Sequence, residues 1–299
     1  MRATPTIGRP GDRAAVRSLT LDDVVATYVV DGVVAVRPET FFPETPRDSW
    51  EHLCTPGGEL LMSVGGLLVQ IAGTTVLIDA GVGMMTASLT FGRVDSGSML
   101  DVLNTLGVRP EDPDVLAITH LHFDHAGWAF ASNAKTFPNA RYALAAQEWT
   151  PHAAAHLDEA EVTPRQVISQ LSSGGTDFET FDDGDEIVPG VRALVTPGHT
   201  PGHTSYVITS QAGRRLIAFG DVFHSSTQVR HPDWMSIADL DREGVTTARR
   251  RLLERLSEPE TYGFGCHFGD QPFGQVVVDA AWKATWVPIP SVVLAPPPR

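Results

Sequence analysis

Cysteine is scarce in this chain, with only 2 among 299 residues. Two thiols cannot build a disulfide framework or a cysteine-rich zinc module, so both classes are excluded. Positive charge is also scarce, because 22 Lys and Arg stand against 36 Asp and Glu and the net charge is −14. Binding to phosphate needs a basic surface, so this balance argues against a nucleic-acid partner.

Long hydrophobic runs are missing as well. The longest, Leu60 to Ala72, is too short and too interrupted by glycine to cross a bilayer. The N-terminal residues carry arginine but no apolar stretch, so they do not read as a signal peptide. We therefore expect a cytoplasmic protein without a membrane partner. The hydrophobic fraction of 42% is too high for a disordered chain, and the length suits one large domain or two small ones.

Helical and β-type patterns alternate irregularly along the chain. Patterns typical of strands lie at 67–72, 75–78, 115–119, 191–196, 205–209 and 215–219, and amphipathic helical patterns lie at 96–106 and 246–256. A further helix is expected from Thr163-Pro164 to about Leu171. Two strands around a tight Asp31-Gly32 turn are expected in 24–36, and a loop in 41–58. This mixture predicts an α/β sandwich of mixed sheets.

The chain divides by composition into three parts. We expect a polar N-terminal arm over residues 1–20, a single domain over 21–287 and a proline-rich tail over 288–299. Residues 145–175 form an insertion that could cap a site. The arm could pack on a second copy of the chain, so a homodimer is left open.

Histidine is the abundant residue, with 11 in the chain, and several are clustered. Three His and one Asp fall within six positions directly after the predicted strand at 115–119: His120, His122, Asp124 and His125. Imidazole and carboxylate are the ligands that Zn²⁺ prefers where thiolate is lacking. Because alternate residues can point the same way, one loop of this spacing can supply ligands to two adjacent metal ions.

Three later segments carry the same ligand types, and the first two of them follow predicted strands. A tight Pro/Gly loop holds His199 and His203, Asp221 follows the strand at 215–219, and His267 stands in a Gly-flanked loop next to Cys266. Each of these alone would be read as an ordinary loop residue. We expect His203 to be structural, with hydrogen bonds in its loop, and Cys266 to be a small buried residue.

The ordered set of these motifs resembles the metallo-β-lactamase superfamily over roughly residues 60–275. The resemblance implies an αββα sandwich with two metal ions at one edge, most often Zn²⁺, with Fe or Mn possible. It implies a first site of His120, His122 and His199, a second of Asp124, His125 and His267, and Asp221 bridging both. Asp79 matches the family's carboxylate that supports the metal loops.

Within the superfamily, a bridging Asp221 resembles the glyoxalase II, N-acyl-homoserine-lactonase and organophosphate-hydrolase-like branches rather than true β-lactamases. The string from His122 to Gly127 is particularly similar to the lactonases. Lactonases have a Tyr three residues after the bridging Asp, and this chain has His224 there. That departure weakens the assignment of a lactone as substrate.

The implied reaction is attack of a metal-bridging hydroxide on the carbonyl of an ester, lactone or thioester. Asp124 is the candidate proton shuttle, and His224 is a candidate for polarising the carbonyl. The implied partner is a small molecule with an apolar acyl or aryl part. Candidate pocket residues flank the metal loops: Phe123, Trp128, Phe223, Trp234 and Phe268.

Three alternative functions remain open. The same metals could serve a phosphotriester hydrolase, and fewer of them a mononuclear-iron sulfur dioxygenase. A non-catalytic scaffold is the third, although none of the seven ligands is missing. Outside the site, His152 and His156 are interpreted as solvated surface residues, and Arg249–Arg251 as the solvated face of a helix.

Overall fold

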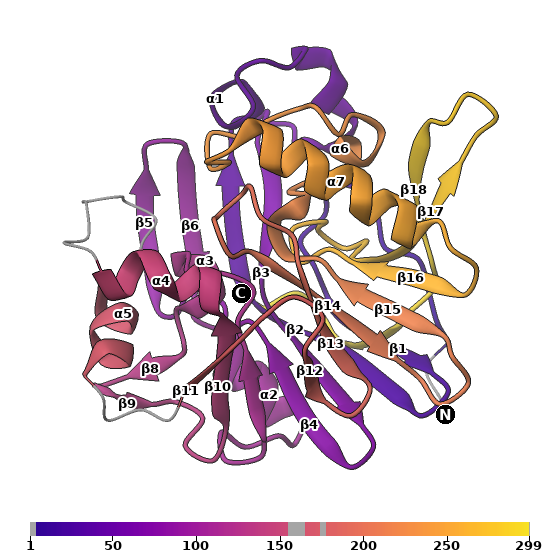
Figure 1. Cartoon of the computed structure of the whole chain (residues 1–299). Helices are drawn as coiled ribbons and strands as arrows, with labels where there is room; N and C mark the ends of the chain where they lie inside the picture. Colours follow the sequence, from indigo (N-terminus) through magenta and orange to yellow (C-terminus); the bar gives the residue numbers. More distant parts are fainter. Residues whose placement is uncertain (1–3, 155–164, 174–177, 299) are drawn as a thin grey trace.

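The computed structural model of the protein describes residues 4–154, 165–173 and 178–298 (Figure 1). Strands of the larger sheet are β1 (Val16–Leu21), β2 (Val24–Val36), β3 (Leu60–Ile71), β4 (Thr74–Ile78), β5 (Met85–Leu89), β6 (Gly92–Ser96), β7 (Val115–Ala117), β10 (Arg141–Ala145), β11 (Phe178–Phe181) and β19 (Val292–Ala295). They lie in the order β11-β10-β7-β4-β3-β2-β1-β19, with β6 paired to β2 and β5 paired to β6.

A second sheet has the order β12-β13-β14-β15-β16-β17-β18. Its strands are β12 (Glu186–Val188), β13 (Val191–Val195), β14 (Thr204–Thr209), β15 (Arg215–Ala218), β16 (Thr261–Phe264), β17 (Phe273–Val278) and β18 (Ala284–Pro288). A short hairpin joins β8 (Phe130–Ala131) to β9 (Ala134–Lys135). Both main sheets mix parallel and antiparallel pairs. In the larger sheet β4 is parallel to β7 and antiparallel to β3, and in the second β16 is parallel to β15 and antiparallel to β17.

The helices are short except for one. They are α1 (Pro38–Phe41), α2 (Met99–Thr105), α3 (Phe123–Ala126), α4 (Ala146–Ala154), α5 (Arg165–Ser172), α6 (Ser226–Arg230) and α7 (Arg242–Leu256), with 3₁₀ turns η1 (Arg47–Leu53) and η2 (Gly220–Val222). No helix of the described residues is long and apolar enough to cross a membrane.

The core lies between the two sheets. Leu67 and Val76 of the larger sheet belong to one buried cluster with Tyr206 and Leu216 of the second. Because side chains alternate along a strand, Ile217 faces the other way and packs with Leu252 of α7. Helix α7 therefore covers the outer face of the second sheet (Figure 1). The predicted sandwich of mixed sheets with flanking helices is confirmed.

The predicted turn at Asp31-Gly32 is wrong. Val24–Val36 is one strand, β2, whose register with β3 shifts between Val30 and Gly32. The Asp31 carboxylate is buried and accepts hydrogen bonds from the backbone N–H groups of Val82, Gly83 and Met99. An Asp-Gly pair favours a hairpin turn where no distant contact competes for the side chain. Here N–H groups of distant loops bind the Asp31 carboxylate, and the strand continues through this position.

Other boundaries shift for local reasons. The segment 41–58, expected as loop, contains η1, and α7 begins at Arg242, because the Asp241 side chain caps the helix by accepting from the N–H of Glu243. The break between β3 and β4 falls as predicted, since Gly73 has a φ of +78°. The expected helix start at Thr163-Pro164 lies outside the described residues.

The expected arm and tail meet in the larger sheet. Strand β1 includes residues 16–20, and β19 from the tail pairs with it. Arg17 binds Asp270 through two hydrogen bonds of 2.7 Å, three residues after His267. The N-terminal segment is thus tied to one of the loops that carry candidate ligands.

Candidate metal centre

Four loops bring the candidate ligands together, and each follows a strand. His120 and His122 follow β7, and the single turn of α3 carries Asp124 and His125. The other three loops follow β13, β15 and β16 and carry His199, Asp221 and His267. Because strands of both sheets end at this edge of the sandwich, residues 142 positions apart become neighbours, as His125 and His267 show with ring centroids 5.4 Å apart.

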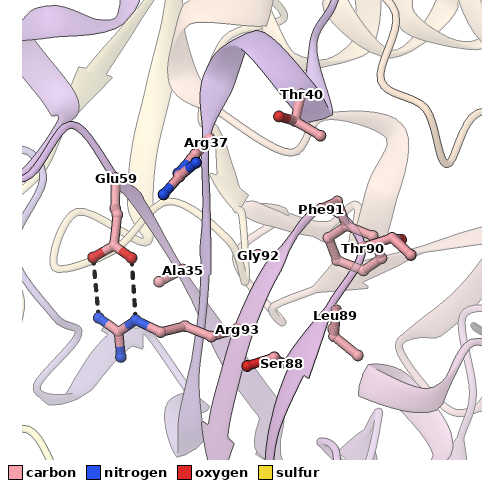
Figure 2. A pocket seen from close by; sticks show the side chains of 10 residues that line it. All are labelled: Ala35, Arg37, Thr40, Glu59, Ser88, Leu89, Thr90, Phe91, Gly92 and Arg93. Atoms are coloured by element: carbon pink, nitrogen blue, oxygen red, sulfur yellow. Dashed lines mark hydrogen bonds and ion pairs between the residues drawn. The ribbon is translucent and has the colours of Figure 1, made fainter.

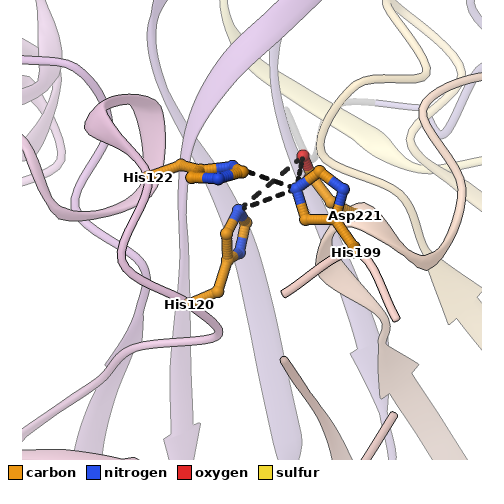
Figure 3. Close-up of side chains that lie close together, drawn as sticks. All are labelled: His120, His122, His199 and Asp221. Atoms are coloured by element: carbon orange, nitrogen blue, oxygen red, sulfur yellow. Dashed lines mark hydrogen bonds and ion pairs between the residues drawn. The ribbon is translucent and has the colours of Figure 1, made fainter. Parts of the chain in front are cut away.

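The first cluster consists of His120, His122, His199 and Asp221, whose ligand atoms all lie within 4.8 Å of one another (Figure 3). The Nε2 atom of His199 is 3.2 Å from Nε2 of His120 and 3.0 Å from Nδ1 of His122. All four residues are buried. Three imidazoles that converge in this way, with a carboxylate beside them, match the donor set of a Zn²⁺ site.

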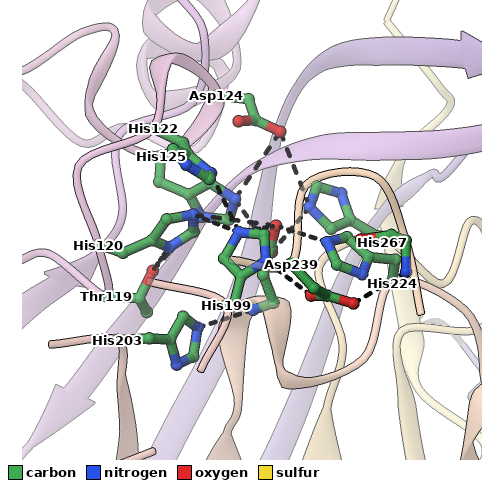
Figure 4. Close-up of polar contacts among 12 residues, drawn as sticks. Thr119, His120, His122, Asp124, His125, His199, His203, His224, Asp239 and His267 are labelled. Atoms are coloured by element: carbon green, nitrogen blue, oxygen red, sulfur yellow. Dashed lines mark hydrogen bonds and ion pairs between the residues drawn. The ribbon is translucent and has the colours of Figure 1, made fainter. Parts of the chain in front are cut away.

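The second cluster lies on the other side of Asp221. Its Oδ1 atom is 3.1 Å from Nε2 of His125 and 2.9 Å from Nε2 of His267, whereas Oδ2 is 3.3 Å from Nε2 of His199 in the first cluster. The Oδ2 atom of Asp124 is 3.8 Å from each of the two Nε2 atoms of His125 and His267 (Figure 4). The two oxygens of Asp221 therefore face different clusters.

Several polar atoms in the second cluster have no hydrogen-bond partner among the described residues. These buried atoms are Nε2 of His125, Nε2 of His267 and Oδ1 of Asp221. An unsatisfied buried polar group costs about 1–3 kcal/mol. A cation held between these atoms would remove that cost, so the residues present fit a metal ion.

The electrostatics of the clusters differ. Burial and the neighbouring histidines lower the pKa of His120 and His122 well below the ordinary value, which leaves both rings neutral and able to ligate. Burial also lowers the pKa of His125 and His267, but the Asp221 carboxylate outweighs it and raises both. The second cluster thus has a negative potential that attracts a positive charge, whether a proton or a metal ion.

Asp79 lies beside the ligand loops, as the resemblance to the superfamily implied. Its carboxylate accepts from Nδ1 of His125 at 2.8 Å and from the N–H and hydroxyl of Thr119 at 2.8 and 2.9 Å. Asp79 has a φ of +63°, an uncommon backbone conformation for a residue other than glycine. These bonds orient the His125 ring, so that Nε2 points into the second cluster.

His203 makes hydrogen bonds rather than joining a cluster. Its Nε2 accepts from the N–H of Asp221 at 2.9 Å, and its Nδ1 pairs with the Thr196 hydroxyl at 2.9 Å. Gly220 lies against this ring, and a Cβ at position 220 would come within 2.7 Å of Nε2. His203 therefore holds the backbone that presents Asp221.

The sequence analysis missed two carboxylates that support the centre. Asp239, whose side chain is 0% exposed, accepts from Nδ1 of His199 at 3.0 Å and pairs with Arg249 at 3.1 Å. Glu148 accepts from the N–H of Leu121 at 2.8 Å and of Gly202 at 3.0 Å, and so joins two ligand loops. Neither residue belongs to a motif, so no local signal could have identified them.

The interpretation of Arg249 as a solvated residue is wrong. Arg249 is 0% exposed, and its guanidinium donates to the carbonyl oxygens of Val222 and Trp234 at 2.7 and 2.6 Å as well as to Asp239. Arg250 and Arg251 on the same helix are exposed, as expected. His156 lies outside the described residues, as does the side chain of His152.

His224 lies at the edge of both clusters. Its Nε2 is 3.2 Å from Oδ2 of Asp221, its ring is stacked 5.9 Å from that of His267, and Phe41 contacts it edge-on. Neither of its ring nitrogens has a hydrogen-bond partner among the described residues. Burial lowers its pKa, which favours the neutral ring with a single N–H.

A small cavity opens beside the clusters. Its lining combines the polar residues His122, Asp124, Asp221 and His224 with an apolar wall of Val34, Phe41, Met62, Phe91, Phe123 and Ala238. A second, outer groove shares Phe91 and is bordered by Arg37 and by the Glu59–Arg93 ion pair (Figure 2). Phe91 therefore stands between the clusters and the outer groove.

Of the five aromatic residues expected in the pocket, Phe123 lines this cavity. The structure places the other four elsewhere. The indole N–H of Trp128 donates to Asp31 at 2.9 Å, and Trp234 stacks on His231 at 4.0 Å. Phe223 and Phe268 are buried in the cluster beneath α7. Aromatic residues next to ligand loops serve the core as readily as a pocket.

The family model of the metallo-beta-lactamase superfamily matches residues 66–267. The chain belongs to this superfamily. Among curated relatives, the N-acyl homoserine lactonase of Bacillus cereus is 26% identical over 243 residues, which cover 76% of this chain and 90% of the relative. The N-acyl homoserine lactonase of a Bacillus species is 28% identical over 235 residues, covering 74% and 87%.

Two solved structures share the fold over nearly the whole chain. AidC, a dizinc quorum-quenching lactonase in complex with a product, superposes with a TM-score of 0.80 at 21% identity and covers 93% of this chain and 98% of its own. The hydrolase AbOPH has a TM-score of 0.78 at 23% identity, with 92% and 98% covered. At these identities the likeness concerns the fold.

Proposed function

We propose that the protein is a dinuclear-metal hydrolase that opens the ring ester of a lactone with an acyl side chain. The observation that carries this proposal is the position of Asp221, whose two oxygens face two separate ligand clusters. The similarity to curated lactonases from Bacillus supports the choice of a lactone.

Seven residues would hold the two metal ions. His120, His122 and His199 would bind the first, Asp124, His125 and His267 the second, and Asp221 both. Zn²⁺ suits this set of imidazole and carboxylate ligands. Two divalent ions of this kind supply a nucleophile from water at neutral pH and polarise a carbonyl oxygen.

Two side chains of the cavity are suited to the remaining chemistry. Asp124, whose side chain is 12% exposed, lies between the second cluster and the cavity, where it can pass a proton to the leaving oxygen of the ring. His224 lines the cavity and can donate its N–H to the carbonyl oxygen as negative charge develops on it. It would thereby act in place of the tyrosine hydroxyl of similar lactonases.

The apolar wall of the cavity favours an uncharged hydrocarbon part in the substrate. Phe41, Phe91 and Phe123 face the metal clusters from α1, the β5–β6 turn and α3. An acyl chain placed along this wall would leave water and bury apolar area.

The test is a substrate panel on the metal-loaded protein. Lactones with acyl chains of increasing length, a thioester, an aryl ester and a phosphotriester are compared by kcat/KM, and metal content is measured on the same sample. We expect about two metal ions per chain and the highest kcat/KM on a lactone. A phosphotriester as the best substrate would overturn the proposal, as would one iron per chain with oxygen uptake.

His224 has its own test within this panel. His224→Phe should lower kcat on the best lactone by roughly 100-fold while the metal content stays at the wild-type value, because removing one donor to a developing oxyanion has an effect of this size. His231→Phe is the matched control, since His231 stacks on Trp234 away from the cavity. Unchanged turnover in His224→Phe would remove this residue from the reaction.

A further inference from the structure

We propose that Cys266 supplies a thiolate ligand to the second metal position, beside His125, His267 and Asp221. One ligand atom from each of these four residues lies within 4.8 Å of the other three. This inference rests on the dinuclear centre proposed above and adds a residue to it. The sequence favours a merely structural role for Cys266, since the ligand set is complete without it.

The spacing of the four atoms suits a metal ion. With Asp124, these residues would give the second metal ion five protein ligands, and at metal–nitrogen distances near 2.0–2.1 Å and metal–sulfur distances near 2.3 Å two ligand atoms on one ion lie roughly 3–4.4 Å apart. Oδ1 of Asp221 is 3.1 and 2.9 Å from Nε2 of His125 and His267, and the sulfur lies within the 4.8 Å limit. All four residues are buried.

Independent atoms point to the same position. Nε2 of His125, Nε2 of His267 and Oδ1 of Asp221 are buried, and none has a hydrogen-bond partner among the described residues. Cys266 belongs to the apolar cluster between the sheets, with Phe264 and Phe273 as members of the same cluster. Its sulfur nevertheless lies within 4.8 Å of one ligand atom of each of His125, His267 and Asp221.

The backbone of Cys266 is held firmly in place. Its carbonyl oxygen accepts from the Tyr28 hydroxyl at 2.8 Å and from the Ser63 hydroxyl at 2.6 Å. The carbonyl oxygen of Ser63 in turn accepts from Nδ1 of His267 at 2.8 Å. These bonds fix both residues of the Cys266-His267 pair, so that the sulfur and the imidazole reach the same position together.

Charge also favours a thiolate at this position. Two divalent ions bring four positive charges into a buried site in which Asp124 and Asp221 supply two negative charges. On metal binding the thiol would release its proton to solvent, and the thiolate would supply a third negative charge. Thiolate is a soft ligand, so Cys266 would favour Zn²⁺ or Co²⁺ over Mn²⁺.

Replacement of the metal by Co²⁺ tests the proposal with a spectrum rather than with activity. Wild-type protein, Cys266→Ser and the control Cys54→Ser are loaded with Co²⁺, and metal content is measured on each. Cys54 is the only other cysteine in the chain and is half-buried next to η1. We expect a sulfur-to-cobalt charge-transfer band in wild type and Cys54→Ser, and its loss in Cys266→Ser.

The outcomes separate the two proposals. Two Co²⁺ ions per chain without a charge-transfer band would overturn the role of Cys266 and leave the dinuclear centre standing. Fewer than two ions per chain in wild type would overturn both. If Cys266→Ser does not fold, the band in Cys54→Ser decides, because Cys266 is then the remaining thiol.

A second readout uses the Zn²⁺-loaded protein. X-ray absorption should detect a sulfur neighbour at about 2.3 Å from zinc in Cys54→Ser. Cys266→Ala should bind the second Zn²⁺ at least about tenfold more weakly in competition with a chelator, because even indirect partners of a metal contribute that much. Equal affinity in Cys266→Ala and wild type would contradict the proposal.

Discussion

The buried pair of Arg249 and Asp239 makes a quantitative prediction. Arg249→Met removes the guanidinium but fills the space of its aliphatic stem. It leaves the Asp239 side chain, which is 0% exposed, without its arginine partner, and it leaves the carbonyl oxygen of Val222 without the donor from Arg249, whereas that of Trp234 keeps its hydrogen bond from Gln228. Removing one partner of a buried ion pair costs about 3–5 kcal/mol, so we expect the free energy of unfolding to fall by that amount.

Urea unfolding of the metal-free protein, followed by tryptophan fluorescence, measures this loss. Arg250→Met is the matched control, because Arg250 is the next residue of α7 and is exposed, and its stability should be almost unchanged. Arg249→Lys should fall between wild type and Arg249→Met, because lysine keeps the charge but not the forked donors. A loss below about 1 kcal/mol in Arg249→Met would refute the reasoning.

Three further predictions concern the metal centre. Asp221→Ala should lose the second metal ion and the activity together, measured by metal content and kcat; activity that survives would contradict a bridging role. Glu148→Ala leaves the N–H groups of Leu121 and Gly202 unpaired, and it should weaken binding of the first metal roughly 10–100-fold in chelator competition, whereas Glu148→Gln should weaken it less. Burial lowers the pKa of His203 to about 3 from an ordinary value of 6.5. His203 is therefore neutral in the folded protein and takes up a proton only on unfolding. Its contribution to the free energy of unfolding is complete above pH 6.5 and falls as the pH drops from 6.5 toward 3, by at most about 1.4 kcal/mol per pH unit. Unfolding of metal-free protein at several pH values should show a shallower slope in His203→Gln, and an identical slope would contradict this assignment.

Local motifs explain why the ligands were predictable from the sequence. His120, His122, Asp124 and His125 fall within six positions, and each later ligand follows a strand. Ligand types and strand ends can both be read from short windows of sequence, and the same windows predicted a sandwich of mixed sheets, whereas the αββα arrangement came from the resemblance to the superfamily. The structure brings the side chains of these residues close together, and their role as ligands is part of the proposal.

Supporting groups escaped prediction because their partners are far away in the chain. Asp31 accepts from N–H groups 51 and 52 residues later, and Asp239 meets His199 across 40 residues. A buried carboxylate of this kind looks in the sequence like a turn or surface residue. Arg249 escaped for a different reason. Its acid, Asp239, is only 10 residues away, but an arginine-rich helical pattern does not show which arginine is buried.

The apolar wall of the cavity comes from segments other than those that carry the candidate metal ligands. Val34, Phe41, Met62 and Phe91 come from β2, α1, β3 and the β5–β6 turn, and none of these segments carries a candidate ligand. Substitutions in this wall can therefore change the acyl group that fits without moving a metal ligand. Phe91→Ala would join the cavity to the outer groove, and we expect it to shift kcat/KM toward longer acyl chains while metal content stays constant. A parallel loss of metal would show that the wall and the centre are not independent.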